Sequence, residues 1–324
     1  MKIAIIYHPA RMRATEDKIY GTHRKILYPN LKRFRKAFQR AHHRVTALDG
    51  RGNLTTKIRR AKPDIVFNLY SVPGKAQAYV PALLEKIGMP YTGCSALCHF
   101  LAMHKGLASK VLRYDKIPVP PFASVNRKER KPSRQLEFPV LVKPCSLGAS
   151  EGISEQSFVE SAKELPEAIE TALAVDKEAL ITKYIPGREL TVGIIGNKKL
   201  QILPILEKHF EPKPSPPRIF TEKLKKKADH WHTKVTVPKM ATLQEDTVKK
   251  VATRAYRSMK CTDYARIDLR LDNQGIPWVI DVNTLPGIFP KFSPMAKMAK
   301  EIGKTAEYLA LRILEEAIER YALQ

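Results

Sequence analysis

Two strand-like segments joined by a turn, close to the C-terminal end of the chain, constrain the fold more than any other feature. Residues 263–270 and 278–287 each alternate polar side chains with Ile, Leu or Val, which is the period of a half-buried strand. The stretch between them, residues 271–275, carries Asp, Asn and Gly and predicts a tight turn. Together the three stretches predict an antiparallel β-hairpin.

One face of this hairpin is expected to collect oxygen atoms. Asp281 and Asn283 are two residues apart and therefore point to the same side of their strand, and Asp268 lies on the opposing strand. Two carboxylates and one amide oxygen suit a hard cation such as Mg²⁺, which keeps water and substrate phosphate oxygens as its other ligands. An ordinary hairpin with a solvated polar face is the alternative, and the rest of the chain has to decide between them.

The first ninety residues alternate between strand and helix patterns. Buried strands are predicted at residues 2–7, 45–48 and 64–69, with amphipathic helices between them. This alternation predicts an α/β fold with a parallel sheet. Ligands of such sheets bind beyond the carboxyl ends of the strands, which directs attention to His8 and Tyr70.

Helices are also predicted in the central part of the chain. One covers residues 95–112 and carries His104 and Lys105, and another covers residues 158–173. A proline-rich stretch, residues 117–121, forces an extended connection after the first of them.

A glycine- and serine-rich turn follows a predicted strand at residues 138–143. Lys143 ends that strand, and the turn runs from Ser146 to Gly152. Glycine allows positive φ and close approach, so backbone N–H groups of such a turn can close on phosphate oxygens. The tip of an ordinary hairpin is the alternative, but the lysine directly before the turn favours phosphate binding.

The charge of the chain is strongly basic. Lys and Arg number 57 against 32 Asp and Glu, a net charge of +25, which attracts polyanions. The cations are scattered, for example over residues 32–36, and no zinc-finger, homeodomain or RNA-recognition motif accompanies them. A basic surface around an enzyme of anionic substrates is favoured, and nucleic-acid binding is the second interpretation.

The cysteines and apolar runs predict a cytoplasmic protein without a membrane segment. The apolar run at residues 3–7 is too short for the core of a signal peptide, and no run is long enough to span a bilayer. Cys94 and Cys98 could share a helix face, but no second ligand pair accompanies them, so the sequence does not predict a zinc site. The four cysteines form no disulfide framework, which suggests a reducing compartment; they are Cys94, Cys98, Cys145 and Cys261.

Residues 207–238 are the least regular part of the chain. Prolines at alternating positions within residues 212–217 exclude a helix there, and lysines follow at residues 223–227. A mobile loop over an active site and a disordered basic insertion are equally supported.

Taken in order, these pieces resemble the ATP-grasp superfamily and, within it, the D-alanine–D-alanine ligase-like group. The resemblance extends from Val66 to the C-terminal helices. No single piece is specific, but seven occur in the family's order and at its spacing. They are Val80–Glu85 with Met89–Gly93, Lys105 with Lys110, Ile117–Pro121, Val142–Gly152, Pro186–Glu189, Arg266–Arg270 and Asp281–Gly287.

The resemblance implies an ATP-grasp fold, of class α/β with an α+β character in the ATP-grasp part, preceded by a parallel-sheet domain. We expect an N-terminal α/β substrate domain at residues 1–93, a central ATP-grasp subdomain at residues 94–186 and a C-terminal subdomain with a metal site at residues 187–324. A homodimer is a further expectation.

The resemblance also implies an ADP-forming ligase that activates a carboxylate as an acyl phosphate, which an amine then attacks to form an amide. The expected cofactors are ATP and two Mg²⁺ ions, with Mn²⁺ as an alternative metal. Charge neutralisation and positioning dominate such phosphoryl transfer. The positions that match the family's ATP-binding residues are Lys105, Lys143, Ser146, Gly148, Ala149, Ser150, Gly152, Thr182, Lys183, Tyr184, Ile185, Glu189 and, in a loosely aligned loop, Lys226.

The residues that match the family's metal and catalytic positions lie mostly on the hairpin. Asp268, Asp281 and Asn283 match the metal ligands, although Asp281 replaces the more usual glutamate. Arg266 matches the arginine that stabilises charge on the acyl phosphate and its adduct. Gly287 matches a backbone donor near the same oxygen, and Ser150 is the third residue expected in catalysis.

The substrate loops depart from the family. D-alanine ligases carry a His-Gly pair and a Gly-Glu-Asp motif after the third strand, where this chain has residues 68–76 without the histidine or the acidic pair. We therefore expect a different substrate, namely a larger amino acid, a peptide or an acidic metabolite. Its carboxylate would be bound by cations such as Arg11, Arg13, Lys75 and Lys291. A genuine D-alanine–D-alanine ligase of cell-wall synthesis and a basic nucleotide- or polyanion-binding module with little catalysis are the alternatives.

Overall fold

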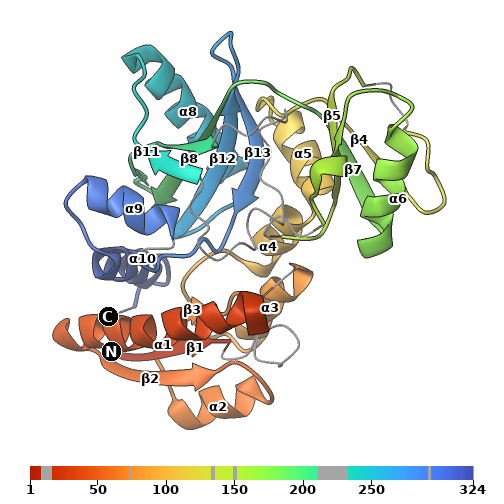
Figure 1. Cartoon of the computed structure of the whole chain (residues 1–324). Coiled ribbons are helices and arrows are strands. Elements are labelled where there is room, and N and C mark those ends of the chain that lie inside the picture. The colour runs from red at the N-terminus through yellow and green to blue at the C-terminus, as the bar shows by residue number, and fades with distance from the viewer. Residues whose placement is uncertain are drawn as a thin grey trace.

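The structure is a computed structural model that describes residues 1–8, 17–72, 74–132, 136–148, 152–210, 233–290 and 293–323. These residues form three sheets with helices packed around them (Figure 1). The sheets contain residues 2–69, 122–183 and 188–283, so each falls within one of the three ranges predicted as domains. The division into domains stays a proposal.

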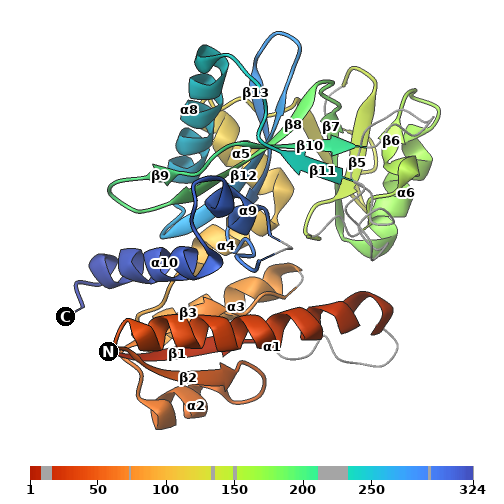
Figure 2. The same ribbon diagram turned by 60° about the vertical axis from the view of Figure 1, so that its left-hand side comes forward.

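The N-terminal sheet is parallel, as predicted, with the order β2-β1-β3. Its side chains alternate between two cores, because Ile3 and Ile5 pack against α1 while Ala4 and Ile6 pack against α2 and α3. Helices α1 and α2 accordingly lie on opposite faces of this sheet (Figures 1 and 2). The elements of this part are β1 (Lys2–Tyr7), α1 (Asp17–Arg40), β2 (Arg44–Asp49), α2 (Leu54–Ala61), β3 (Ile65–Leu69), η1 (Gly74–Ala78) and α3 (Tyr79–Lys86).

The central sheet is antiparallel and has the order β4-β7-β5-β6. Helix α6 packs on one of its faces and shares a core with it that includes Ile169, Leu173 and Ile181. The elements here are α4 (Ala96–Met103), α5 (Lys105–Tyr114), β4 (Phe122–Asn126), β5 (Val140–Pro144), η2 (Glu155–Ser157), β6 (Phe158–Val159), α6 (Leu165–Val175) and β7 (Glu178–Lys183).

The C-terminal sheet has the order β11-β10-β8-β12-β13, with β9 paired to β8. One face packs against α4, α5 and α8, and the other packs against α9 and α10. Helix α10 also contacts α1, which joins this sheet to the N-terminal part. The elements are β8 (Arg188–Ile195), β9 (Gln201–Ile202), β10 (Leu206–Phe210), β11 (Thr233–Thr236), α8 (Thr242–Ser258), β12 (Tyr264–Leu271), β13 (Pro277–Asn283), α9 (Pro294–Glu301) and α10 (Ala306–Arg320).

Two of the predicted helices are wrong in extent. The helix predicted over residues 95–112 is broken at His104, whose backbone is extended, with φ −105° and ψ 91°. The His104 ring caps the second piece, because its Nδ1 accepts from the backbone N–H of Leu107 at 3.2 Å. The helix predicted from residue 158 begins at Leu165, since residues 158 and 159 pair with β5 as a short strand.

Among the described helices, none combines the length and the apolar composition needed to cross a bilayer.

Candidate active site

The predicted hairpin is confirmed, and its register brings the three predicted oxygen ligands together. Strands β12 and β13 pair antiparallel, with Asp268 opposite Asp281 and Arg266 opposite Asn283. Residues directly opposite each other project from the same face of a sheet. The amide nitrogen of Asn283 lies 3.4 Å from Asp268 Oδ2 and 3.2 Å from Asp281 Oδ2. A β-bulge after Asp268 interrupts the hydrogen bonding between the two strands. Such a bulge changes the direction of the side chains beside it.

Asp268 is the most heavily partnered of these groups. Arg266 donates to both of its carboxylate oxygens at 2.9 Å, and the hydroxyl of Thr191 on β8 donates at 2.6 Å. The ammonium of Lys208 on β10 lies 3.5 Å from Oδ2. Burial alone would raise the pKa of Asp268, but the charges of Arg266 and Lys208 and these hydrogen bonds hold it well below its ordinary value. The carboxylate is therefore anionic at neutral pH.

Lys208 and Arg270 join the hairpin to Glu189, the residue matched to ribose binding. Lys208 Nζ donates to Glu189 Oε1 at 2.9 Å, and Arg270 Nη1 lies 3.6 Å from Oε2. Only 8% of Glu189 is exposed. The buried Lys208 keeps a raised pKa, since desolvation is outweighed by Asp268 and Glu189. The result is an alternating row of opposite charges across β10, β8 and β12.

Arg270 also fixes the segment between β7 and β8. Its Nε donates to the carbonyl of Ile185 at 2.9 Å and its Nη2 to the Tyr184 hydroxyl at 3.0 Å. The guanidinium lies 5.0 Å from the centre of the Tyr184 ring, within cation–π distance. Residues 184 and 185 are therefore held against the C-terminal sheet, where the two antiparallel sheets meet.

The neighbouring residues of that segment face the central sheet. Thr182 is buried, and its backbone pairs with β4 and β5. The backbone N–H of Lys183 donates to the carbonyl of Pro121 at 2.8 Å, and its ammonium pairs with Glu137. The side chain of Lys183 thus points to Glu137, so a contact of Lys183 with a bound ligand would be made by its backbone.

The two lysines matched to phosphate binding lie on β5 of the central sheet and at the start of α5. Lys143 is on β5, and Lys105 begins α5 and donates from Nζ to the carbonyl of Leu147. Burial and, after it, the charge of Lys105 lower the pKa of Lys143 to about 8, against the opposing charge of Asp281. The charge of Asp281 on the hairpin thus acts on Lys143 of the other sheet.

The glycine-rich turn after Lys143 is described at its two ends. At the first end the backbone N–H of Ser146 donates to Asp176 at 2.6 Å, and Gly148 follows. At the far end Gly152 has φ +72°, and a Cβ there would lie 2.7 Å from Pro144, so the turn needs glycine at this position. Ala149 and Ser150 lie outside the described residues.

Gly287, the predicted backbone donor, follows the hairpin. Its carbonyl accepts from the Ser293 hydroxyl. Other predicted residues lie outside the part of the chain that the structure describes, namely Arg11, Arg13, Lys226 and Lys291, and for Lys75 the side chain does.

A cavity of about 520 Å³ lies at the carboxyl edge of the N-terminal sheet. His8 and Tyr70 directly follow strands β1 and β3 and meet edge to face, with ring centres 5.1 Å apart. A Cβ on Gly50 would lie 2.4 Å from the Tyr70 ring, so glycine is required for the ring to take this place. The lining is mostly aromatic and apolar, and it includes His8, Gly50, Asn53, Tyr70, Val72 and Tyr79.

Three residues of this charged cluster were given no role from the sequence. Thr191, Lys208 and Arg270 contact Asp268 or Glu189, yet two of them are 60 or more residues away from Asp268 in the chain. Strand pairing between β8, β10 and β12 creates the contacts. An alternating Glu-Lys-His pattern at residues 207–209 was the only local signal for Lys208.

The chain is similar to known ligases over most of its length. The family model described as "D-ala D-ala ligase C-terminus" matches residues 111–315. "Uncharacterized protein y4sG" of Sinorhizobium fredii is 32% identical over 296 residues, which cover 88% of this chain and 86% of that protein. "D-alanine--D-alanine ligase A" of Bacillus cereus is 32% identical over 269 residues, 81% of this chain and 83% of the relative.

The fold matches a solved ligase over nearly its whole length. The crystal structure of the D-alanine–D-alanine ligase of Bacillus anthracis complexed with ATP superposes with a TM-score of 0.75 at 24% identity. The match covers 98% of both chains. The predicted ATP-grasp fold is confirmed.

Proposed function

The chain belongs to the D-alanine–D-alanine ligase family of ATP-grasp ligases, and from this premise we propose that it joins a carboxylate to an amine through an acyl phosphate, with release of ADP. The observation that carries the proposal is the charged face of the β12–β13 hairpin. There Arg266, Asp268, Asp281 and Asn283 are in register, and the charge of Asp281 acts on Lys143 of the central sheet.

The side chains fit the two cofactors of the family, ATP and Mg²⁺. Asp268, Asp281 and Asn283 would hold the metal, because carboxylate and amide oxygens are the ligands that Mg²⁺ prefers. Lys105 and Lys143 would contact phosphate oxygens, and Glu189 would accept hydrogen bonds from the ribose. When bound, Mg²⁺ neutralises negative charge on the phosphates during transfer.

Arg266 is the group we assign to charge stabilisation in the reaction. Its Nε and Nη2 are fixed by Asp268, which holds the guanidinium plane against β12. The pKa of Arg266 is raised, since the charge of Asp268 outweighs desolvation, so the side chain stays cationic. A fixed cation needs no reorganisation when negative charge develops on an acyl phosphate or its tetrahedral adduct.

We further propose that the substrates are not two D-alanines. The rim of the N-terminal sheet carries residues 68–76, with Asn68 and Tyr70, in place of the family's His-Gly and Gly-Glu-Asp motifs. The cavity there, about 520 Å³ and lined by aromatic rings, is larger than a methyl side chain requires. An amino acid or peptide with a larger side chain fits this lining. A genuine D-alanine–D-alanine ligase is the second candidate, favoured by the relatives of that name.

The test is a screen for ADP release. The full chain with ATP and Mg²⁺ is offered single amino acids of both configurations, pairs of them and dipeptides, and products are identified by mass spectrometry. Asp281→Asn is the matched control for contaminating ATPase. We expect a product containing at least one residue larger than alanine.

Three outcomes separate the candidates. Turnover restricted to D-alanine, with D-alanyl-D-alanine as product, contradicts the substrate proposal but keeps the ligase. Product formation by wild type and Asp281→Asn alike contradicts the assigned site. Salt-sensitive binding of nucleic acid without turnover of any amino acid favours the polyanion-binding alternative.

A further inference from the structure

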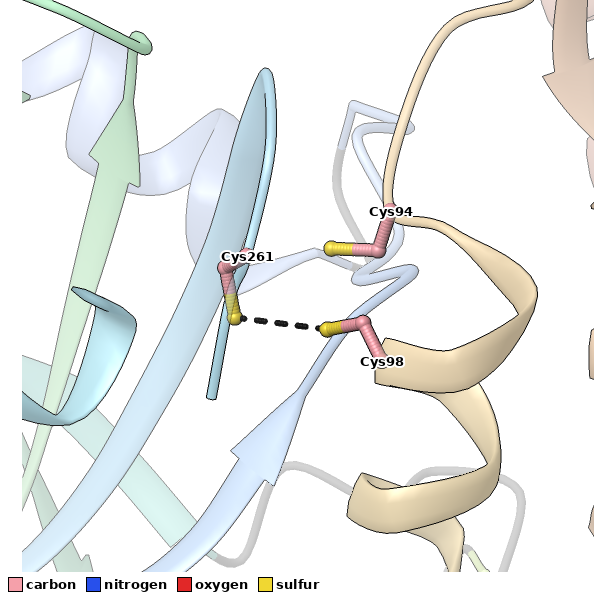
Figure 3. A group of neighbouring side chains, drawn as sticks. All are labelled: Cys94, Cys98 and Cys261. Atoms are coloured by element: carbon pink, nitrogen blue, oxygen red, sulfur yellow. Dashed lines mark hydrogen bonds between the residues drawn. The ribbon is translucent and has the colours of Figure 1, made fainter. Parts of the chain in front are cut away.

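Three cysteine side chains from distant parts of the chain converge in the core (Figure 3). Cys94 precedes α4, Cys98 lies in its first turn, and Cys261 lies in the loop between α8 and β12. The Cys98 and Cys261 sulfurs are 3.8 Å apart, and all three sulfurs lie within 4.8 Å of one another. Cys94 and Cys98 are fully buried, and Cys261 is 7% exposed.

We propose that Cys94, Cys98 and Cys261 form a site for one thiophilic cation, Zn²⁺ or Cu⁺. Both cations favour thiolate ligands. At a metal–sulfur distance of about 2.3 Å, two sulfurs of a tetrahedral site are about 3.8 Å apart. The separation of Cys98 and Cys261 equals this value, whereas a disulfide would require about 2.05 Å. The inference is independent of the proposed ligase activity.

The backbone around the cysteines is fixed by contacts that do not involve sulfur. Asp263 accepts from the N–H of Gly93 at 2.7 Å and from two nitrogens of Arg320, and the Thr262 hydroxyl donates to the Gly93 carbonyl at 2.9 Å. The segment bearing Cys94 is thereby locked to the loop bearing Cys261. A metal site needs such preorganised ligands, because ordering them on binding would reduce affinity.

Two features favour thiolates at this position. The N-cap Ser95 begins α4 directly beside Cys94 and Cys98, and the positive end of a helix stabilises a thiolate. The second feature is the ring of His99, which supplies a hydrogen-bond donor. Its Nδ1 contacts the Thr284 hydroxyl at 2.7 Å and the Gln77 amide nitrogen at 3.2 Å.

The state of the His99 ring follows from those contacts. With the amide nitrogen of Gln77 donating to Nδ1, the ring carries its proton on Nε2. Nε2 is buried and has no partner among the described residues.

Binding must release protons. The Cys94 thiol now lies 3.7 Å from the Thr262 carbonyl and 3.9 Å from that of Tyr264, as a weak donor. A metal–sulfur bond replaces each S–H bond, and the proton passes to solvent, up to three for the site. Affinity is therefore expected to rise with pH.

The experiment uses the full chain, reduced and stripped of metal with a chelator. One equivalent of Zn²⁺ or, under anaerobic reduction, Cu⁺ is added, the sample is desalted, and retained metal is counted by mass spectrometry. We expect about one ion per chain and a rise in Tm of about 5 °C. X-ray absorption at the metal edge of the wild-type protein should show three sulfur neighbours, at about 2.3 Å for zinc.

Variants locate the ion. Cys98→Ser and Cys261→Ser should retain less than a tenth of the metal, with folding checked by circular dichroism. Cys145→Ser is the matched control, since Cys145 is also buried but lies with His104 and Glu178 in a separate group. It should retain the full equivalent.

Several outcomes would overturn the proposal. An oxygen- and nitrogen-dominated shell, or loss of metal in Cys145→Ser, places the ion elsewhere. Failure of wild type to retain either ion means that the three thiols serve only as small apolar core residues. Because the absorption measurement uses the unaltered chain, a variant that fails to fold does not leave the proposal undecided.

Discussion

The hairpin face and the rim of the N-terminal sheet differ in how their polar groups are held. On the hairpin, Asp268 has charged or hydrogen-bonding partners from four strands, and the charges alternate. At the rim, three rings and several apolar side chains line the cavity, and the described lining contains no Asp, Glu, Lys or Arg. The first arrangement suits phosphate and metal chemistry, and the second suits a neutral side chain. One region thus indicates the reaction, and the other indicates the substrate.

The largest effect is expected when a metal ligand is removed from the hairpin. Asp281→Asn should reduce kcat for ADP release by about 10²- to 10³-fold, because one negative ligand of the cation is lost. Asp272→Asn is the control at the opposite end of the same hairpin, where the carboxylate accepts from Gln274, Ile276 and Trp278. It should keep activity within a few fold, and equal losses in both variants would contradict the assignment.

The second prediction concerns the link between the two regions. Asp263 is fully buried, and Arg320→Ala would leave its carboxylate without its cation. The free energy of unfolding should fall by about 3–5 kcal/mol in urea titrations. Arg130→Ala, which breaks a pair with Glu170 in which both side chains are more than half exposed, should cost about 1 kcal/mol or less. Equal losses of stability in the two variants would contradict the prediction that the buried Asp263–Arg320 pair links the two regions.

A pH profile tests the phosphate side of the site. The pKa of Lys143 is lowered to about 8 from an ordinary value of 10.5, so kcat/KM for ATP should fall about tenfold per pH unit above pH 8. The unfolded chain binds the Lys143 proton more tightly than the folded chain does. Lys143 therefore makes the free energy of unfolding rise with pH between about pH 8 and pH 10.5. The expected decline in kcat/KM above pH 8 is therefore not caused by unfolding. Lys143→Arg should remove it, and an unchanged profile would show that Lys143 does not contact ATP.

The smallest effect is expected at the rim. Tyr70→Ala should raise KM for the amino-acid substrate about tenfold and broaden the range of side chains accepted, because one wall of the cavity is removed. The KM for ATP should not change, since the hairpin is untouched. A proportional change in both constants would indicate a general disturbance of the fold and would end the distinction between the regions.

The sequence by itself determined the local elements. The hairpin at residues 263–287 and the parallel strands at residues 2–7 and 64–69 follow from side-chain period and turn residues, which act over a few positions. The metal-ligand face could also be predicted from the sequence, because Asp281 and Asn283 are two residues apart on one strand. The order of motifs indicated the family.

Only the tertiary structure decided the contacts between distant residues. Lys208 reaches Asp268 across 60 positions, and Cys261 reaches Cys98 across 163, through strand pairing and loop packing that no local pattern encodes. The break at His104 has the same origin, since its ring lies 3.3 Å from Glu178 of β7. Periodicity specifies which face a side chain takes, and packing specifies what it meets there.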